Sequence, residues 1–301
     1  PERIVWDRPC QARTTRDNPV MVPGIVRMFP LPSYGSDAFR DEVRRYLSLL
    51  AGGLRSLAAP RGPVILAQLD HAAVLAQRCG PYEQDYHPDT IRRYRAHLRK
   101  QYGGLEQLNE AYGPAEGEQD RRFATIEPPH RFDARLPEEV LQHLDWVGFQ
   151  EALVADAYAS FADALREGGL HGCALSCQLP SVAEQAAVNV AELTEVVDLL
   201  GVPISGVASE STRVRLARET SAHAICARSC AAPPYAAELA SGFAPLSAPL
   251  STNDVFFSAM TALAYGIRGF NLHMAVERNR FIGAPVGVHG ESGKEAEQWR
   301  R

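Results

Sequence analysis

The 301-residue chain lacks any run of roughly 18 to 20 consecutive apolar residues, the length that a membrane-spanning helix requires. It also lacks a charged opening segment followed by an apolar stretch, which is the pattern of a secretory signal peptide. There is no excess of basic charge either, because 31 Lys and Arg stand against 36 Asp and Glu for a net charge of -5. We therefore expect a cytoplasmic protein that binds neither a membrane nor a nucleic acid.

Cysteine is scarce and poorly spaced for a metal site. Among six cysteines, only Cys173 with Cys177 and Cys226 with Cys230 lie close in the sequence. A strand separates residues four apart by about 13 Å, too far to share one metal ion. On a helix, however, Cys226 and Cys230 would share a face. We interpret these cysteines as buried thiols and expect no metal. The chain also has no G-x-G-x-x-G turn, so no cofactor is expected.

The patterns that are present alternate between helices and strands. Helical periodicity covers residues 36–57, beginning at Ser36 or Asp37, then 88–103, beginning at Asp89, and 137–168, with Leu144 and Leu153 facing inward. Apolar strands are predicted at 64–69, 173–179, 197–204, 234–239 and 269–276. We expect one domain over residues 1–301, in which 1–35 form an irregular loop segment and 287–301 a polar tail.

Strands that are apolar throughout and alternate with helices predict an α/β fold with a parallel sheet covered on both faces. A doubly wound sheet would need a glycine-rich phosphate turn, which is missing, whereas a (β/α)8 TIM barrel needs polar residues at the carboxyl ends of its strands. The sequence favours the barrel, because polar residues follow four of the strands: Gln68, Asp70 and His71; Ser176 and Gln178; Glu238; Asn271, His273, Glu277 and Arg278.

Carboxylates from different strands around one barrel mouth are the arrangement that glycoside hydrolysis uses. A retaining glycosidase places two of them about 5 to 5.5 Å apart, one as the nucleophile and one as the general acid and base. Glu238 is the best candidate for the nucleophile, because it ends an apolar strand and small residues follow it. The alternative is that Glu238 only caps the following loop or helix.

Four blocks carry a resemblance to a known family. In order, they are GPVILAQLD, YEQDYHPDTIRRYRAHLRKQYGGLEQLNEAYG, AELASGF and GFNLHMAVERNRFIGAP. Together they resemble the catalytic barrel of β-galactosidase-type glycoside hydrolases of families 35 and 42, in clan A, over roughly residues 25–290. The resemblance implies a fourth strand that ends in Gln-x-Asp-Asn-Glu, with the Glu as general acid/base. Gln68 and Asp70 match this motif, but His71 replaces the Asn and Ala72 replaces the Glu.

The resemblance also implies roles for residues at the other strand ends. Glu238, at the end of strand seven, corresponds to the nucleophile. The residues expected to bind the sugar are Gln68, Asp70, Asn271, His273, Glu277, Arg278 and Phe281. No cofactor is implied, and the expected partner is a carbohydrate ligand.

The alanine at position 72 leaves the activity open. The chain either acts on β-galactosides with a displaced acid/base, or it is a pseudoenzyme that binds carbohydrate or serves as a structural or interaction protein. His71 is one substitute, although it should point to the other side of the strand from Asp70 unless a bulge re-aims it. Glu83 and Asp85, in the following loop, are other substitutes. A metal-dependent hydrolase that uses Asp70, His71 and His273 is a third hypothesis.

The numbering of the strands raises a further expectation. If residues 64–69 form strand four, the chain covers about strands 4–8 and nothing in it corresponds to strands 1–3. An open five-stranded remnant would expose unpaired strand edges. We therefore expect that the barrel is incomplete on its N-terminal side, and that a longer polypeptide or another chain supplies the missing strands.

Overall fold

The structure is a computed structural model that describes residues 6–23, 27–71, 80–113, 122–180, 188–204, 206, 209–242, 250–278, 282–293 and 295–300. The chain divides into two compact units. The first, here called the helical unit, comprises Pro1–Ile65, Ala73–Cys173 and Gln185–Val196. The second, here called the sheet unit, comprises Leu66–Ala72, Ala174–Glu184 and Val197–Arg301.

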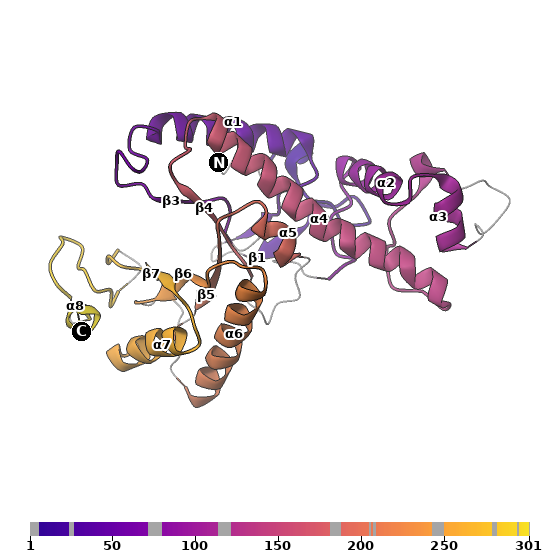
Figure 1. The fold of residues 1–301 in the computed structure, drawn as a ribbon. Helices are drawn as coiled ribbons and strands as arrows, with labels where there is room; N and C mark the ends of the chain where they lie inside the picture. Colours follow the sequence, from indigo (N-terminus) through magenta and orange to yellow (C-terminus); the bar gives the residue numbers. More distant parts are fainter. Residues whose placement is uncertain are drawn as a thin grey trace. The chain divides into compact units, whose positions relative to one another are not determined.

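The helical unit is built around the long helix α4. Its helices are α1 (Asp37–Leu54), α2 (Pro88–Tyr102), α3 (Leu105–Tyr112), α4 (Pro137–Glu167) and α5 (Val190–Thr194), with short turns η2 (Arg8–Cys10) and η4 (Phe123–Thr125). The strands β1 (Met21–Pro23) and β2 (Met28–Pro30) form an antiparallel pair. Helix α1 runs beside α4 (Figure 1), and the aromatic rings of Tyr34, Phe39, Tyr158 and Phe161 pack between them.

Local sequence signals set the helix ends. Ser36 caps α1, because its side chain accepts a hydrogen bond from the backbone N–H of Phe39. Gly103 ends α2 with a positive φ of 75°, which glycine adopts without steric cost. The prediction that Asp89 caps α2 is wrong, because His87 is the N-cap. Asp89 is the second residue of the helix, and its carboxylate accepts a hydrogen bond from the backbone N–H of Asp37.

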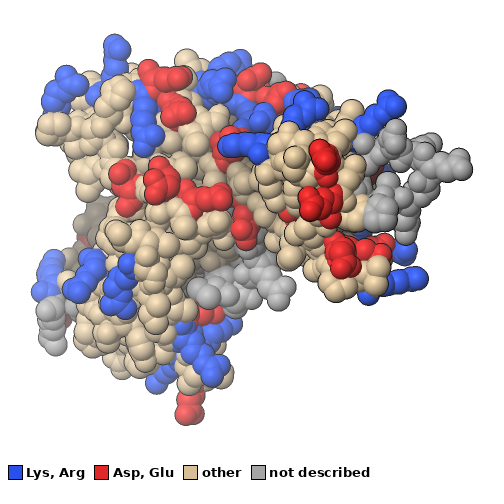
Figure 2. All heavy atoms as spheres, turned by 45° about the vertical axis from the view of Figure 1, so that its right-hand side comes forward, with Lys and Arg blue, Asp and Glu red and all other residues tan. Residues whose placement is uncertain are grey.

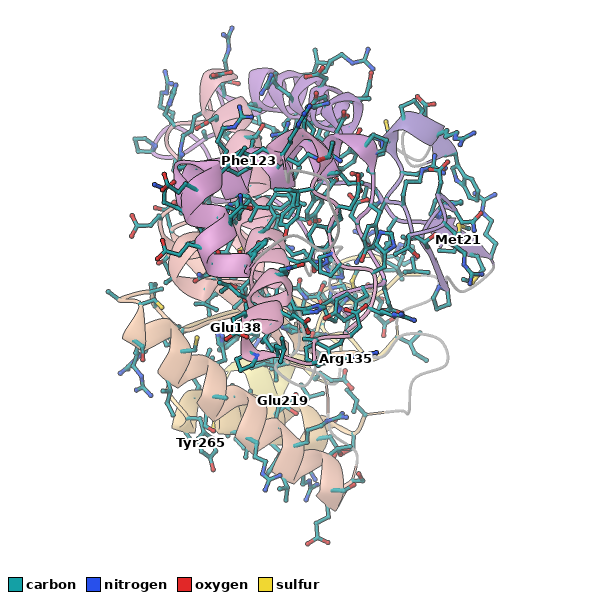
Figure 3. The ribbon with its side chains drawn as sticks, turned by 90° about the vertical axis from the view of Figure 1, so that its right-hand side faces the viewer. Met21, Phe123, Arg135, Glu138, Glu219 and Tyr265 are labelled. Carbon is teal, nitrogen blue, oxygen red and sulfur yellow. The ribbon has the colours of Figure 1, made fainter. Side chains whose placement is uncertain are left out.

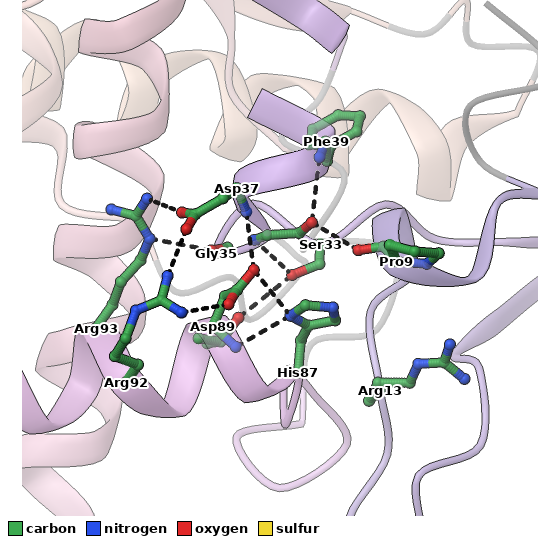
Figure 4. A network of polar contacts seen from close by, with 12 residues as sticks. Pro9, Arg13, Ser33, Gly35, Asp37, Phe39, His87, Asp89, Arg92 and Arg93 are labelled. Atoms are coloured by element: carbon green, nitrogen blue, oxygen red, sulfur yellow. Dashed lines mark hydrogen bonds and ion pairs between the residues drawn. The ribbon is translucent and has the colours of Figure 1, made fainter. Parts of the chain in front are cut away.

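The acidic residues at the starts of α1 and α2 form a polar network with the arginines of α2 (Figure 4). Asp37 pairs with Arg92 at 2.6 Å and with Arg93 at 2.7 Å, and Arg92 also pairs with Asp89 at 2.5 Å. Each carboxylate therefore has a guanidinium partner and lies in the first turn of a helix, where negative charge is favourable. The network joins the two helix starts.

The sheet unit contains a parallel sheet whose strands follow the order of the chain. The strands are β3 (Leu66–Gln68), β4 (Ala174–Gln178), β5 (Leu199–Ile204), β6 (Tyr235–Ala240) and β7 (Gly269–His273). The helices of this unit are α6 (Glu210–Ser229), α7 (Thr252–Ala264) and α8 (Ala296–Arg300). Within the described residues the sheet has five strands, and the predicted parallel sheet is confirmed.

The two faces of this sheet differ in chemistry. The side chains of Leu200, Val202 and Leu239 are buried, and α6 and α7 pack against β5 and β6 (Figure 1). The register places Gln68 beside Ser176, and Pro203 beside Glu238. Because side chains alternate along a strand, these residues share the opposite face. The helices therefore pack on the apolar face of the sheet, and the polar side chains lie on the other face, where a site can form.

A bulge interrupts β6 at Ala237 and Glu238. Ala236 pairs with Phe270 and Leu239 with Leu272, so that Ala237 and Glu238 together oppose the single residue Asn271. A bulge of this kind re-aims a side chain and increases the local twist. It sets the direction of the Glu238 carboxylate.

Candidate active site

The carboxyl ends of β3 and β6 bring two of the predicted residues together. The Nδ1 atom of His71 lies 3.5 Å from Oε1 of Glu238, with 64% of the His71 side chain and 26% of the Glu238 side chain exposed. Two strands, β4 and β5, lie between β3 and β6 in the sheet. Neighbouring strands are about 4.8 Å apart, so a flat sheet would hold these two strand ends roughly 14 Å from each other. The sheet therefore curls, and both side chains lie on its concave side.

His71 thus does not follow the alternation expected from the sequence. Strand β3 ends at Gln68, and the next residues leave the extended conformation. Asp70 makes this turn, because its Oδ1 atom accepts a 2.7 Å hydrogen bond from the backbone N–H of His71. The turn allows the imidazole to face Glu238.

The remaining polar groups at the end of β3 also hold the site together. The Nε2 atom of Gln68 donates to the carbonyl of Asp70 at 3.0 Å and lies 3.5 Å from Oε1 of Gln178 on β4. Beneath them, Cys177 is fully buried. Burial, reinforced by the negative charge of Asp70, raises the pKa of the Cys177 thiol to about 12. This cysteine is consequently an inert packing residue, as interpreted from the sequence.

The end of β7 forms the other side of the site. Asn271 donates from Nδ2 to the carbonyl of Ala237 at 3.3 Å, which ties it to the bulge. Ser241, which the sequence analysis missed, donates its hydroxyl to the carbonyl of Met274 at 2.6 Å, and its backbone N–H binds the carbonyl of His273. The small, polar Ser241 in the AELASGF block was the available signal for this residue.

Glu277 and Arg278 follow β7. An oxygen of Glu277, Oε1, accepts a 2.9 Å hydrogen bond from the backbone N–H of Gly283, so this carboxylate stabilises its own loop. Arg278 is exposed. Ala72 and Phe281, two further predicted site residues, lie outside the described residues.

The two loop carboxylates considered as substitute acids belong to the helical unit. Asp85 is only 2% exposed and accepts four hydrogen bonds, from the hydroxyls of Ser33 and Thr90 and from the backbone N–H groups of Arg13 and His87. Burial raises the pKa of the Asp85 carboxyl, and these hydrogen bonds oppose the rise. Asp85 is therefore a structural residue, contrary to that hypothesis. Glu83 is exposed and accepts from the backbone N–H of Gly80 at 3.1 Å.

Metal and surface charge add little to the site. In the part of the chain that the structure describes, no three His, Cys, Asp or Glu side chains gather closely enough to hold a metal ion. Asp70, His71 and His273 thus do not form such a group.

Figure 2 shows both Lys and Arg and Asp and Glu on the visible surface, in small groups of each sign. None of the described helices is long and apolar enough to cross a membrane.

The sequence of residues 72–244, more than half of the chain, matches the profile of glycoside hydrolase family 42, described as beta-galactosidase. The chain belongs to glycoside hydrolase family 42. This is one of the two families that the sequence blocks resemble. A search of curated proteins finds no match to this family 42 chain.

Solved structures of β-galactosidases share the fold of this family 42 chain. The enzyme of the psychrophilic Marinomonas ef1 has a TM-score of 0.74 at 16% identity, with 99% of this chain and 46% of that chain covered. The enzyme of the Antarctic haloarchaeon Halorubrum lacusprofundi has a TM-score of 0.74 at 18% identity, with 99% and 45% covered. The enzyme of Bacillus circulans sp. alkalophilus has a TM-score of 0.70 at 12% identity, with 99% and 43% covered.

These likenesses establish the fold, and the predicted fold class is confirmed. The family 42 chain spans less than half the length of these structures. The five parallel strands among the described residues form a curled portion of the (β/α) barrel, with the polar strand ends on the concave side.

Proposed function

We propose that the concave side of the sheet unit binds a β-linked galactoside, and that Glu238 is the carboxylate that attacks the anomeric carbon. The observation that carries this proposal is the contact between Glu238 and His71 across β4 and β5. It brings a partly exposed carboxylate and a hydrogen-bonding imidazole to one point at the carboxyl ends of the strands, where enzymes of this fold place their sites. Gln68 and Asn271 lie beside this pair and offer amide groups for sugar hydroxyls.

The geometry favours one role for His71 over another. A retaining acid/base lies about 5 to 5.5 Å from the nucleophile, so that the anomeric carbon fits between the two groups. The Nδ1 atom of His71 is closer to Glu238, at 3.5 Å. This spacing suits a group that orients the nucleophile. We therefore propose His71 as a positioning residue rather than as the displaced acid.

A second candidate function is carbohydrate binding without catalysis. It is favoured by the alanine at position 72 and by the hydrogen bonds of Asp70 and Glu277 to backbone N–H groups. Those two carboxylates are engaged in holding loops. On this proposal the chain is a pseudoenzyme whose polar strand ends bind a sugar and whose Glu238 is one of the ligands.

A mechanism-based inactivator separates the two candidates. A 2-deoxy-2-fluoro-β-galactosyl fluoride forms a stable ester on a nucleophilic carboxylate and needs no general acid, because fluoride leaves unaided. We expect one added fluorogalactosyl group, located on Glu238 by peptide mapping, and none on the E238Q variant. The matched control is E219Q, which alters a partly exposed glutamate of α6 (Figure 3) and should be labelled like the wild type.

The other outcomes are informative. Galactose binding without labelling, if H71A and E238Q weaken it, would establish the non-catalytic candidate. Neither labelling nor galactose binding would refute both candidates.

We further propose that another segment or another chain completes the barrel. A (β/α)8 barrel closes with eight strands, and the described sheet has five, with β3 and β7 at its edges. Amides on the outer edges of β3 and β7 should therefore exchange rapidly in the isolated 301-residue chain. Strong protection of both edges in a monomeric sample would contradict this proposal.

A further inference from the structure

A pair of free cysteines at the end of α6 lies outside the site described above and has no part in the proposed function. Cys226 lies on α6, and Cys230 is the C-cap of this helix. The backbone N–H of Cys230 still donates to the carbonyl of Cys226 at 3.3 Å, which is the hydrogen bond of an α-helix. Residues four apart on a helix face each other, with Cβ atoms about 5 to 6 Å apart. Of the two geometries weighed from the sequence, the helical one is therefore present.

The other closely spaced pair of cysteines shows what the helix changes. Cys177 lies on β4, and Cys173 immediately precedes this strand. An extended backbone separates the two by about 13 Å. Both are buried, and the Sγ atom of Cys173 donates to the carbonyl of Val64 at 3.0 Å. The two pairs have the same spacing in the sequence, but of the two it is the α6 pair that shares one face and is partly open to solvent.

The spacing on α6 is too long for a disulfide and suits an ion held between the two sulfurs. A disulfide holds its Cβ atoms about 3.8 Å apart, with an S–S bond of about 2.0 Å. Two metal–sulfur bonds of about 2.3 Å on opposite sides of one ion hold the sulfurs about 4.6 Å apart, which matches the helical spacing of the Cβ atoms more closely. The two thiols also interact, because burial raises the pKa of the Cys226 thiol and the negative charge of Cys230 raises it further.

The number and type of ligands select the class of ion. Among the described residues, no third His, Cys, Asp or Glu side chain joins the pair to make a metal-binding group. A structural zinc site takes four ligands, whereas thiolates select soft ions such as Cu(I), which binds two sulfurs in a line. The carbonyl groups at the C-terminal end of α6 carry partial negative charge, which favours a cation. A soft monovalent cation therefore fits both the ligands and the helix end.

We propose that Cys226 and Cys230 form a two-coordinate site for a soft monovalent cation, above all Cu(I). Each thiol loses its proton to solvent, and each sulfur donates an electron pair to the ion. The oxidation states of sulfur and copper do not change, so the step needs neither an oxidant nor a reductant. The bound ion bridges the last turn of α6 and should slow amide exchange there.

The test titrates the reduced 301-residue chain with Cu(I) under nitrogen, in competition with a chromogenic Cu(I) chelator, and repeats the titration with Ag(I). We expect one ion per chain at every protein concentration, and an X-ray absorption spectrum with two sulfur neighbours at about 2.3 Å. C226S and C230S should each weaken binding by about 10²-fold, the lower end of the gain from a second linked ligand. Bound Cu(I) should also protect Cys230 from iodoacetamide.

Matched variants separate one shared site from two independent thiols. Ile225 is 59% exposed, so C226S/I225C keeps two accessible thiols but places them five residues apart, on different sides of the helix. This variant should bind as weakly as C226S. C173A and C177A remove the pair of equal sequence spacing and should bind like the wild type. Cys79 lies outside the described residues, and C79A should also bind like the wild type.

Several results would overturn the inference. Unchanged affinity with half the capacity in C226S and C230S, or wild-type affinity in C226S/I225C, would show that the thiols act independently. Loss of binding in C79A would place another sulfur in the site, and a native Cys226–Cys230 disulfide would contradict the spacing argument. Amide exchange of β4 and β6 should be the same in each variant as in the wild type, which verifies that the sheet unit is folded. The fluorogalactosyl label on Glu238 is read separately, so neither proposal depends on the other.

Discussion

Acidification should destabilise the sheet unit through one buried histidine. His223 lies on α6, is 2% exposed, and has an Nε2 atom without a hydrogen-bond partner among the described residues. Burial lowers the pKa of His223 from 6.5 to about 4, and the backbone groups of Tyr235 and Leu200 oppose this shift. The folded unit therefore holds the imidazole in its neutral form.

The sign of the effect follows from which state binds the proton. Between pH 6.5 and about 4 the unfolded chain protonates His223 and the folded chain does not, so stability falls as the pH falls. Each pH unit in this window costs about 1.4 kcal/mol, and the total loss is roughly 3 kcal/mol. Below about pH 4 both states carry the proton, and this contribution no longer changes.

Hydrogen exchange measured by mass spectrometry on peptides of α6 and β6 provides the assay. Because the chain has two units, peptide-level exchange is preferable to a single unfolding curve. The free energy of opening should fall steeply from pH 6.5 to 4 in the wild type and less steeply in H223Q. H289Q, which changes an exposed histidine of the same unit, is the control and should resemble the wild type. Identical pH dependence in H223Q and the wild type would refute the reasoning.

Three further outcomes are expected. D145N weakens the buried acceptor of three side-chain hydrogen bonds from α2 and α3, and should lower the unfolding free energy of the helical unit by about 2 kcal/mol in urea denaturation. S36A removes the cap of α1 and should raise amide exchange in its first turn by the equivalent of about 1 kcal/mol. Cys177, with its pKa near 12, should resist iodoacetamide until the chain is unfolded, whereas the partly exposed Cys230 should react in the native protein.

The elements of the fold were predictable because their signals are local. A helix was expected over 137–168, and a helix of 31 residues runs from Pro137 to Glu167, since its apolar residues repeat with helical period. Ser36 and Gly103 mark helix ends by side-chain and backbone chemistry that a sequence displays directly. The inward face was less predictable: Leu153 is buried, but the side chain of Leu144, expected beside it, is 60% exposed. Helical periodicity identifies the apolar face of a helix. The elements that pack against the helix determine which residues of that face are buried.

The site was only half predictable, for a physical reason. Glu238 could be placed at a strand end, but the two-residue bulge that directs it depends on pairing with Asn271 in another strand. His71 was expected to point to the other side of the strand from Asp70, because strand alternation was extended beyond Gln68, where the strand ends. A hydrogen bond from its own backbone to Asp70 replaces that alternation. The bulge depends on pairing with another strand, and the turn at His71 depends on a hydrogen bond after the strand has ended. Residue type alone specifies neither.

The contacts of Gln68 and Asp70 give these two residues a structural role in addition to the role that the sequence motif suggests. From sequence alone they preserve the outline of a glycosidase motif, and that outline suggests catalysis. In the structure Gln68 bonds to the carbonyl of Asp70 and approaches Gln178, and Asp70 holds the turn that carries His71. Both residues therefore have structural contacts at the end of β3 that are present whether or not a sugar is cleaved. The position of Glu238 is thus built into strand pairing, and the role proposed for it is what the labelling experiment tests.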